Sequence, residues 1–461
     1  MSLELDMTAS TRRLAVLLAA GQGKRMASAL PKVMHQVGGR SLVGHVAAAL
    51  SAAGFEEVAV VTGPDGEAVT REARRWATSI CAFAQQERRG TAHATLQARN
   101  AIAKADRIVV AFGDTPLMRP ETFKALSAAL DSGAAVVAVG FETNDPTGYG
   151  RLVIENGALV AIVEHKDATP AQRDIRLCNA GIMGLSGAYA LELLDSIGCD
   201  NAQGEFYLTD AVAAAVARGL PCAALSVEEA DVLGVNDRAQ LAAVEKVFQN
   251  RARAAAMAGG ATLIAPETVY FSFDTRLGRD VIVEPSVWFG PGVEVADGAT
   301  IHAFSHLEGC KLAAGVSVGP FVRLRPGADL RANVKIGNFV EVKNSVMGEG
   351  AKASHLAYLG DASIGAAVNV SAGVITCNYD GYLKHRTVVG EGAFVGTNSS
   401  LVAPVTIGAG GFVAAGSVVT QDVPEDAIAI ARAKQVNKPG LAATFRARKA
   451  AEKAARSRGG S

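Results

Sequence analysis

A six-residue spacing of aliphatic side chains runs through the C-terminal part of this chain of 461 residues. Neither a helix of 3.6 residues per turn nor a single amphipathic strand has this period, whereas each flat side of a parallel β-helix coil does. Glycine often follows the aliphatic residue, as in Val318-Gly319 and Ile407-Gly408, where the chain must turn tightly. We therefore predict a parallel β-helix between about residue 262 and about residue 430, a fold that usually trimerises. The positions six apart are Val281, Val287 and Val293; Val318, Leu324, Leu330, Ile336 and Val342; and Val389, Val395, Leu401, Ile407, Val413 and Val419.

The N-terminal half has a different pattern, in which apolar strand-like runs alternate with helix-like stretches between residues 12 and 240. Such alternation predicts a Rossmann-like α/β domain with a mostly parallel sheet wrapped by helices. Residues 239–258 are rich in helix-forming residues and are expected to form a long connecting helix. The expected division is a domain at 1–238, a linker helix at 239–259, and a β-helix domain with a tail at 260–461. The predicted strands include 14–19, 58–62, 108–112, 135–140 and 182–185.

Composition limits the classes of partner. Lys and Arg together number 45, as do Asp and Glu, and this balance argues against a general nucleic-acid or membrane surface. No apolar run approaches the ~20 residues that span a bilayer, and the first ten residues lack the pattern of a secretory leader. The six cysteines are scattered without a CxxC pair, which is typical of reduced thiols. We therefore expect a cytoplasmic protein without membrane insertion, and a basic final segment that is solvated and frayed.

A glycine-containing loop follows the first predicted strand. Gly21 and Gly23 allow backbone N–H groups to approach an anion closely, and the N-terminus of a following helix would add a positive field. Arg25 and Lys32 supply full positive charges for a polyphosphate. The alternative is a tight strand–helix turn with incidental charges, and the segment is not a Walker loop because GxxxxGK[ST] is absent.

A carboxylate stands just past the end of another predicted strand. Asp114 follows the run at 108–112, at the edge where open α/β sheets bind ligands, and its oxygen atoms suit Mg²⁺. Asn236 provides a second oxygen donor near the end of the domain. The alternative for Asp114 is an Asx-turn before Pro116.

The six-residue register is broken twice within the predicted β-helix. His355 lies in the first break, between Val342 and Ile364, and is a candidate general base; the alternative is a solvated surface group. The second break, at 377–385, predicts an excursion that could reach a neighbouring subunit. Because Leu324 and Val342 point inward, Arg325 and Lys343 point outward, where they could bind an anion or simply be solvated charges.

The motifs in order resemble one bacterial family along nearly the whole chain. They are LAAGQGKRM, LPKVMH, Gln85 with RGTAHA, FGDTP, DPTGYGR, IVEHKDA, NAG and GVND. The family is the bifunctional enzyme of UDP-N-acetylglucosamine synthesis, which joins N-acetylglucosamine-1-phosphate uridyltransferase to glucosamine-1-phosphate N-acetyltransferase. The resemblance implies a homotrimer with a left-handed β-helix of hexapeptide repeats, and acetyl-CoA, UTP and glucosamine-1-phosphate as substrates.

The resemblance also implies roles for individual residues. UTP and the sugar would be bound by Leu18, Ala19, Ala20, Gly21, Arg25, Lys32, Gln85, Gly90, Thr91, Phe112, Asp114, Gly150, Glu164, Asn179 and Asn236, with Mg²⁺ on Asp114 and Asn236. The amino-sugar phosphate would be bound by Arg325, Lys343, Tyr358 and Asn369, and acetyl-CoA by Ala372, Asn378, Tyr379, Thr397, Ala415 and Arg432, with His355 as the catalytic base. The chain departs from the commoner pattern at Lys24, Ala92, Ala180 and Thr397 without losing a proposed ligand.

Two other functions remain possible from the sequence. The first is a sugar-1-phosphate nucleotidyltransferase with a single activity, in which the β-helix serves only as a trimerisation scaffold. Such a scaffold has no need of His355, Lys343 and Arg325. The second is a non-enzymatic exchange-factor subunit, which has little need of the glycine loop together with Arg25, Lys32 and Asp114.

Overall fold

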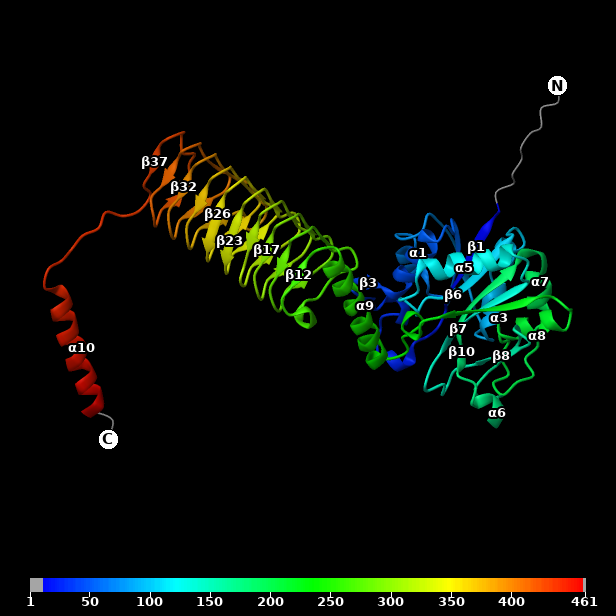
Figure 1. Cartoon of the computed structure of the whole chain (residues 1–461). Coiled ribbons are helices and arrows are strands. Elements are labelled where there is room, and N and C mark those ends of the chain that lie inside the picture. The colour runs from blue at the N-terminus through cyan, green and yellow to red at the C-terminus, as the bar shows by residue number, and fades with distance from the viewer. Residues whose placement is uncertain (1–10, 459–461) are drawn as a thin grey trace, which may run out of the picture. The chain divides into compact units, whose positions relative to one another are not determined.

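The computed structural model describes residues 11–458, so the segment considered for a leader lies outside the described residues. The chain divides into two compact units (Figure 1). The first comprises Met1–Ala258 and Val269–Thr275, and the second comprises Gly259–Thr268 and Arg276–Ser461.

The first unit is built on a mixed sheet that is mostly parallel, as predicted. Its strand order is β11-β7-β10-β6-β1-β4-β5, and β10 alone on this path runs antiparallel to its neighbours. The hairpin β8–β9 joins the sheet through β10. The strands are β1 (Arg13–Ala19), β4 (Glu57–Thr62), β5 (Ser79–Ala84), β6 (Arg107–Phe112), β7 (Val136–Glu142), β8 (Arg151–Glu155), β9 (Ala158–Val163), β10 (Leu177–Ser186) and β11 (Cys222–Val227).

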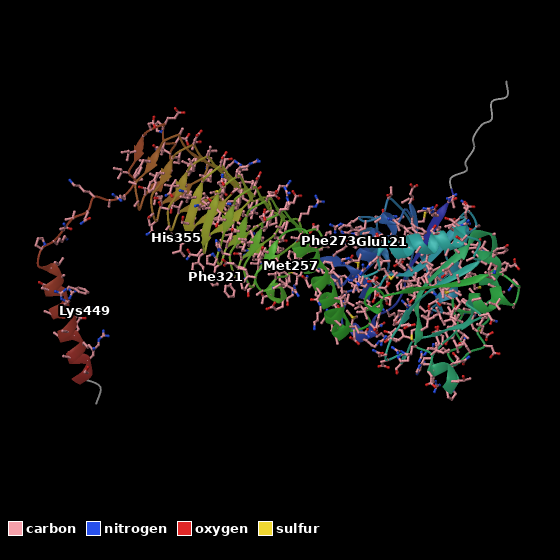
Figure 2. The ribbon with its side chains drawn as sticks, viewed as in Figure 1. Glu121, Met257, Phe273, Phe321, His355 and Lys449 are labelled. Atoms are coloured by element: carbon pink, nitrogen blue, oxygen red, sulfur yellow. The ribbon has the colours of Figure 1, made fainter. Side chains whose placement is uncertain are left out.

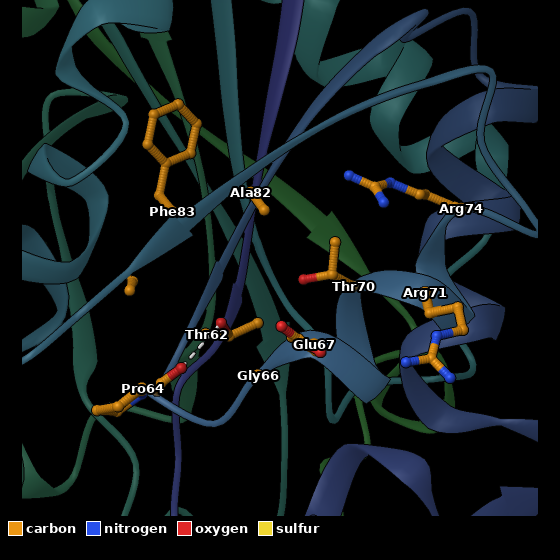
Figure 3. A pocket seen from close by; sticks show the side chains of 11 residues that line it. Thr62, Pro64, Gly66, Glu67, Thr70, Arg71, Arg74, Ala82 and Phe83 are labelled. Carbon is orange, nitrogen blue, oxygen red and sulfur yellow. Dashed lines mark hydrogen bonds between the residues drawn. The ribbon is translucent and has the colours of Figure 1, made fainter.

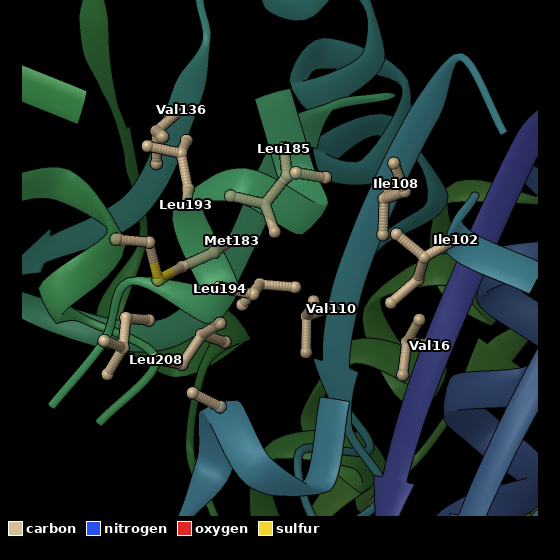
Figure 4. Close-up of a cluster of buried hydrophobic side chains, with 14 of the residues drawn as sticks. Val16, Ile102, Ile108, Val110, Val136, Met183, Leu185, Leu193, Leu194 and Leu208 are labelled. Carbon is tan, nitrogen blue, oxygen red and sulfur yellow. The ribbon is translucent and has the colours of Figure 1, made fainter. Parts of the chain in front are cut away.

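Helices cover both faces of this sheet because successive strand residues point to opposite sides. Val16 packs with Ile102, Val110 and Leu193 on one face, beneath α3, α4, α7 and α8 (Figure 4). Leu17 faces the other side, beneath α1, α2 and α5. The helices are α1 (Leu42–Ala52), α2 (Glu67–Ala73), α3 (Thr91–Leu96), α4 (Arg99–Ile102), α5 (Pro120–Asp131), α6 (Pro170–Arg173), α7 (Gly187–Asp195), α8 (Asp210–Val216) and α9 (Arg238–Ala258).

The expected connecting helix, α9, belongs to the first unit. Its buried Gln249 exchanges two hydrogen bonds of 2.8 Å with the backbone of Phe271, and the Arg253 guanidinium donates to the carbonyl of Val269 at 2.9 Å. The segment Val269–Thr275 therefore returns to the first unit after the chain has entered the second.

The second unit is a parallel β-helix with three sheets, one for each side of its coils. The first side holds β12 (Thr262–Leu263), β14 (Ile282–Val283), β17 (Thr300–Ile301), β20 (Ser317–Val318), β23 (Lys335–Asn338), β26 (Lys352–His355), β29 (Asn369–Val370), β32 (Phe394–Val395), β35 (Phe412–Val413) and β37 (Ile428–Ala429). The second side holds β15 (Trp288–Phe289), β18 (His306–Leu307), β21 (Arg323–Leu324), β24 (Glu341–Lys343), β27 (Tyr358–Gly360), β30 (Ile375–Cys377), β33 (Ser400–Val402) and β36 (Val418–Val419). The third side holds β13 (Arg276–Leu277), β16 (Glu294–Val295), β19 (Lys311–Leu312), β22 (Asp329–Leu330), β25 (Val346–Met347), β28 (Ala362–Ile364), β31 (Thr387–Val389) and β34 (Val405–Ile407).

The predicted six-residue positions are confirmed as the core of this β-helix. Leu324, Val342 and Val395 are fully buried, and the most exposed member of the set, Val419, is only 4% exposed. Each inward side chain lies above its counterpart one coil below, as Val342 does with Leu324. The stack of aliphatic side chains therefore removes apolar surface from water along the whole β-helix.

The expected break in the six-residue register around His355 is confirmed, but the coils themselves are not interrupted there. The chain continues its coils through β26, which pairs with β23 below and β29 above. The six-residue period fails in the sequence because two steps are one residue shorter. The inward Met347 comes five positions after Val342, and Ile364 comes five positions after Leu359. His355 therefore lies on a regular coil.

The second interruption is confirmed as an excursion from the β-helix. Residues 378–386 connect β30 to β31, and a bridge between Tyr379 and Lys384 closes the loop on itself. Tyr382 at its tip is 92% exposed.

The basic C-terminal segment contains a helix, α10 (Leu441–Arg458), so the expectation of a frayed terminus is wrong there. The side chains of residues 441–457 are exposed. Within residues 11–458, no helix is both long and apolar enough to cross a membrane.

Candidate active sites

The first unit has a cavity at the carboxyl ends of β1 and β6. Its volume is about 280 Å³. Ten of the residues predicted to bind nucleotide line it: Leu18, Ala19, Ala20, Gly21, Lys32, Gln85, Gly90, Thr91, Phe112 and Asp114. This is the edge of the sheet at which open α/β folds bind ligands.

An adjoining cavity of about 370 Å³ holds the residues predicted for the sugar. Gly150, Glu164 and Asn179 line it, as does Asn236. Thr91, Phe112, Asp114 and Glu205 line both cavities, so the two form one continuous site. The structure thus brings together the predicted nucleotide and sugar residues, and their individual contacts with substrates stay predictions.

The glycine loop has the conformation that its sequence demands, but no α-helix follows it directly. Gly23 has φ +60°, and a Cβ there would lie 2.6 Å from the Cβ of Lys32, so a side chain would clash. The expected helix N-terminus is wrong, because a three-residue 3₁₀ turn, η1 (Lys24–Met26), follows. Arg25 is exposed and is not among the residues that line the two cavities, so its contact with phosphate stays a prediction.

Lys32, Asp114 and Asn236 converge where the two cavities meet. The Lys32 ammonium donates to the Asp114 carboxylate and, at 3.3 Å, to the Oδ1 atom of Asn236. The Val235 amide donates to the Asp114 carbonyl at 2.9 Å, which places Asn236 beside Asp114. One carboxylate and one amide oxygen thus already face a cation.

This oxygen pair fits Mg²⁺, which usually keeps several waters and is held by one or two carboxylates with substrate phosphates. Among the described residues, no three His, Cys, Asp or Glu side chains gather into a complete metal cage. The remaining ligands would therefore have to come from a bound substrate and from water.

Several residues of the site were not predicted from the sequence. Arg88 lines the nucleotide cavity and donates to the Ala20 carbonyl at 2.9 Å, which fixes the backbone of the glycine loop. Glu205 lines both cavities. Thr209 donates to Glu164 at 3.3 Å. The run QGEFYLTD at 203–210 was the available signal, because it is polar and aromatic within an otherwise alanine-rich stretch.

Burial controls the charge of the sugar cavity. Desolvation raises the pKa of the Glu164 carboxyl, and the nearby charges of Asp210 and Asp167 act in the same direction, while the bond from Thr209 opposes them. A carboxylate in this environment is costly unless a ligand hydroxyl donates to it. Glu164 is thus suited to accept a hydrogen bond from a sugar.

A third cavity lies at the carboxyl ends of β4 and β5 (Figure 3). Thr62, Glu67, Thr70, Arg71 and Arg74 contribute to its lining. No site residue predicted from the sequence is among the described residues that line it.

In the second unit, the predicted base and four of the six predicted acetyl-CoA residues form one ladder along an edge of the β-helix. Ala353, Val370, Val395 and Val413 are stacked partners on consecutive coils. Two residues after each of them come His355, Ala372, Thr397 and Ala415. Arg432 donates to the Ala415 carbonyl at the top of this ladder. The structure therefore aligns five predicted residues that are spread over 78 positions of sequence (355 to 432).

His355 is exposed and oriented by one hydrogen bond. Its Nδ1 atom lies 2.8 Å from the Oδ1 atom of Asn338, which is its strand partner one coil below. Because a carbonyl oxygen only accepts, this contact requires a proton on Nδ1, and in the neutral imidazole the lone pair is then on Nε2. This tautomer is the one that a general base requires.

Two cations, Arg325 and Lys343, lie on the second side of the β-helix, on the two coils that precede the strand following His355. Arg325 forms an ion pair with Glu341 at 2.8 Å, and Lys343 forms one with Asp361 at 3.5 Å. Tyr358 follows His355 and begins the strand above Lys343. The predicted residues Arg325, Lys343 and Tyr358 are therefore brought together on one outward face.

The excursion adds a cation that sequence reasoning missed. A hydrogen bond between the side chains of Lys343 and Lys384 raises the pKa of Lys343, and the same bond together with the charge of Lys343 lowers the pKa of Lys384. Two ammonium groups so close together repel each other, and an anion between them would relieve that repulsion. Lys384 lies within the excursion that the sequence predicts, but the sequence does not show which way its side chain points.

The remaining predicted residues lie around the same region. Asn369 is half-buried on β29, one coil above β26, and its amide lies 3.4 Å from the Ser371 hydroxyl. Asn378 is buried at the base of the excursion and donates to Asp361. Tyr379 is exposed and donates to the Gly381 carbonyl.

Comparison with known proteins places the whole chain. The family model of the MobA-like NTP transferase domain matches residues 15–174. The Bifunctional protein GlmU of Azorhizobium caulinodans is 57% identical over 435 residues, which cover 94% of this chain and 97% of that protein. The proteins of the same name from Agrobacterium fabrum and Paramagnetospirillum magneticum are 52% and 49% identical, over 96% and 97% of this chain and 98% and 99% of their own lengths.

These relatives span both units, which favours two activities over a nucleotidyltransferase with an inert scaffold. The nucleotidyltransferase match falls within the unit that holds the nucleotide cavity. The chain therefore belongs to the GlmU family, the bifunctional enzymes that join a uridyltransferase to an N-acetyltransferase.

Proposed function

We propose that the two sites catalyse successive steps towards UDP-N-acetylglucosamine. The second unit acetylates the amine of glucosamine-1-phosphate with acetyl-CoA, and the first unit transfers a uridyl group from UTP to the product and releases pyrophosphate. The observation that supports this best is the convergence of Lys32, Asp114 and Asn236 between a nucleotide cavity and a sugar cavity.

For uridyl transfer, the sugar phosphate is already an anionic nucleophile, so no strong base is needed. The obstacle is repulsion between two anions and their misalignment. Lys32 offers its charge at the junction of the cavities, where one charge pair at 4 Å is worth ~4 kcal/mol at an effective dielectric of 20. Glu164 and Asn179 hold the sugar so that its phosphate faces the α-phosphorus of UTP. Asp114 and Asn236 would hold Mg²⁺, which neutralises phosphate charge when bound.

For acetyl transfer, the ammonium group must first lose a proton. The Nε2 atom of His355 accepts it, and the amine lone pair then attacks the thioester carbonyl carbon. The C–S bond breaks, the thiolate of CoA leaves with the electron pair, and it takes up the second proton that the nitrogen loses as the amide forms. Arg325, Lys343 and Lys384 hold the sugar phosphate, while the ladder from Ala372 to Arg432 supports the coenzyme.

A homotrimer would complete this second site. Phe304, Phe321 and Phe339 stack on consecutive coils with ring centroids 5.0 and 5.3 Å apart, yet each ring is about half exposed. Leu356, 59% exposed, continues this stripe next to His355, and Figure 2 shows Phe321 and His355 along one edge of the β-helix. A contiguous exposed apolar stripe is typical of an interface. A neighbouring copy would bury it and wall the acetyl-transfer site.

The substrates and the free cysteines fit a cytoplasmic enzyme. A paired assay tests the proposal. CoA thiol release is measured with glucosamine-1-phosphate and acetyl-CoA, and pyrophosphate release is measured with UTP and N-acetylglucosamine-1-phosphate. Pyrophosphate release without thiol release would leave only the single-activity alternative, and neither activity would favour the exchange-factor alternative.

A further inference from the structure

Asp361 occupies a corner of the β-helix, between β27 and β28. Its backbone has φ +50°, a left-handed conformation that Asp tolerates better than most residues. Its side chain is only 11% exposed, although Asp is seldom buried without partners. A carboxylate buried to this extent needs hydrogen-bonding or charged partners.

On one side, Asp361 holds the segment that carries Lys343. Its carboxylate accepts a hydrogen bond from the Asn344 amide at 2.6 Å and pairs with the Lys343 ammonium at 3.5 Å. Its backbone N–H donates to the Lys343 carbonyl at 3.0 Å. Lys343 is thereby fixed at both its backbone and its charged end.

On the other side, Asp361 contacts both ends of the excursion at 378–386. The Asn378 amide, where the excursion leaves the β-helix, donates to the carboxylate. The N–H of Thr387, where the chain re-enters, donates to the Asp361 carbonyl at 3.2 Å. The excursion in turn carries Lys384 to Lys343. Asp361 therefore fixes the position of Lys343, on a coil, relative to Lys384, on the excursion.

The carboxylate is held in its charged form. Burial alone would raise the pKa of Asp361, but the bonds from Asn344 and Asn378 and the charge of Lys343 outweigh burial and lower it. A neutral side chain of the same shape would lose this balance, because an amide presents two N–H donors to groups that are themselves donors.

We propose that Asp361 is a positioning residue for acetyl transfer, which sets the spacing of Lys343 and Lys384 and thereby the affinity for the phosphate of the amino sugar. The inference rests on the proposed role of Lys343 as a phosphate ligand. The carboxylate of Asp361 is engaged by Lys343, Asn344 and Asn378, so Asp361 acts through these neighbours. Its effect is therefore expected in the binding of one substrate rather than in the chemical step.

The full-length enzyme tests this with Asp361→Asn and Asp361→Glu. Asp361→Asn is expected to raise KM for glucosamine-1-phosphate about tenfold or more, while kcat and the KM for acetyl-CoA change less than about threefold, because uniform binding is lost. Asp361→Glu keeps the charge and should raise that KM less. A role in packing alone predicts the reverse order, because Asn is isosteric with Asp and Glu is not.

A second readout does not depend on activity. Trypsin cleaves after Lys384 and Arg386, which are exposed in the excursion, and Asp361→Asn should accelerate cleavage there by weakening the bond from Asn378 that holds one end of the loop. The control is Asp280→Asn, at an Asp of the β-helix that is also left-handed but is exposed, and it should match the wild type in KM and in cleavage. If Asp361→Asn does not fold, Asn378→Ala replaces it in the cleavage assay, because it removes only one bond to the carboxylate.

Lys343→Ala distinguishes the role of Lys343 as a phosphate ligand from the role of Asp361 as a positioning residue. If Lys343→Ala raises KM for glucosamine-1-phosphate but Asp361→Asn leaves KM and cleavage unchanged, the positioning role is refuted and the phosphate site stands. If Lys343→Ala has no effect on that KM, the phosphate assignment fails, and the role of Asp361 fails with it.

Discussion

The ammonium of Lys32 hydrogen-bonds the carboxylate of Asp114 across 82 positions of sequence, at the junction of the nucleotide and sugar cavities. The Asp114 carboxylate thus stabilises the positive charge of Lys32 at this junction. Replacing Asp114 by Asn keeps the shape of the side chain and removes its charge. We expect uridyl transfer to fall by about 100-fold or more, because a proposed metal ligand and the partner of Lys32 are lost together. Acetyl transfer by the same preparation is the control, and a parallel loss of both activities would indicate misfolding.

His355→Ala should have the opposite effect. Without a base, acetyl transfer is expected to fall by about 100-fold to 10,000-fold, the usual contribution of general acid–base catalysis. The rate of pyrophosphate release should be unchanged, because His355 belongs to the second unit. Thiol release from acetyl-CoA is the measurement, and an undiminished rate would eliminate His355 as the base.

Asn338→Asp tests the orientation of that base. A carboxylate in place of the amide would accept the same bond from His355 Nδ1, now 2.8 Å from an uncharged oxygen, and would favour the imidazolium. The pKa of His355 should rise, so the acid limb of the kcat/KM profile for acetyl transfer should move to higher pH. Asn338→Ala should instead lower kcat without that displacement. A profile that stays in place for Asn338→Asp would contradict the assigned tautomer.

Glu164→Gln should stabilise the first unit while weakening its function. Burial raises the pKa of Glu164, so the folded state holds the proton more tightly than the unfolded state does. Its contribution to stability is therefore lost as pH rises through the folded pKa. The Tm of Glu164→Gln should exceed that of the wild type at pH 8, and the difference should vanish as pH falls below the ordinary Glu pKa of about 4.3. The KM for the sugar phosphate should rise, and an unchanged Tm at pH 8 would contradict the effect of burial.

Phe321→Glu should disrupt the proposed trimer. It places a charge in the middle of the stacked rings of Phe304, Phe321 and Phe339, which a neighbouring copy would have to bury. Sedimentation should show a smaller species than the wild type, with acetyl transfer reduced and uridyl transfer retained. Trp288→Glu, at an exposed aromatic outside this stripe, is the matched control. A Phe321→Glu protein that sediments like the wild type would refute this interface.

Much of the fold was predictable, because one constraint repeats along the chain. Every side of a coil needs one inward apolar residue, so positions such as Leu324 and Val395 mark the β-helix directly. The rule fails where the inward residue is less conspicuous or the step is shorter. Ala353 has little apolar surface, and Met347 comes five residues after Val342, so the regular coil that carries His355 looked like a break.

The sites were predictable only in part. The ends of β1 and β6 locate the glycine loop and Asp114, since parallel strands end at one edge. The approach of Arg88 to Ala20 and that of Lys384 to Lys343 depend on loops whose paths are set by tertiary contacts. The two contacts of Asp361 with the excursion likewise join segments whose spacing in sequence carries no periodic signal.

The ladder from His355 to Ala415 makes the length of the proposed coenzyme site a whole number of coils. Neighbouring strands lie about 4.8 Å apart, so three coils separate these two residues by roughly 14 Å. A single substitution can change a side chain of this ladder, but it cannot change the length of the ladder. Only the insertion or deletion of an entire coil would lengthen or shorten it, and then in one jump. Selection for a longer or shorter acyl carrier in this fold would therefore act through duplications of about eighteen residues, three six-residue sides, rather than through point mutations.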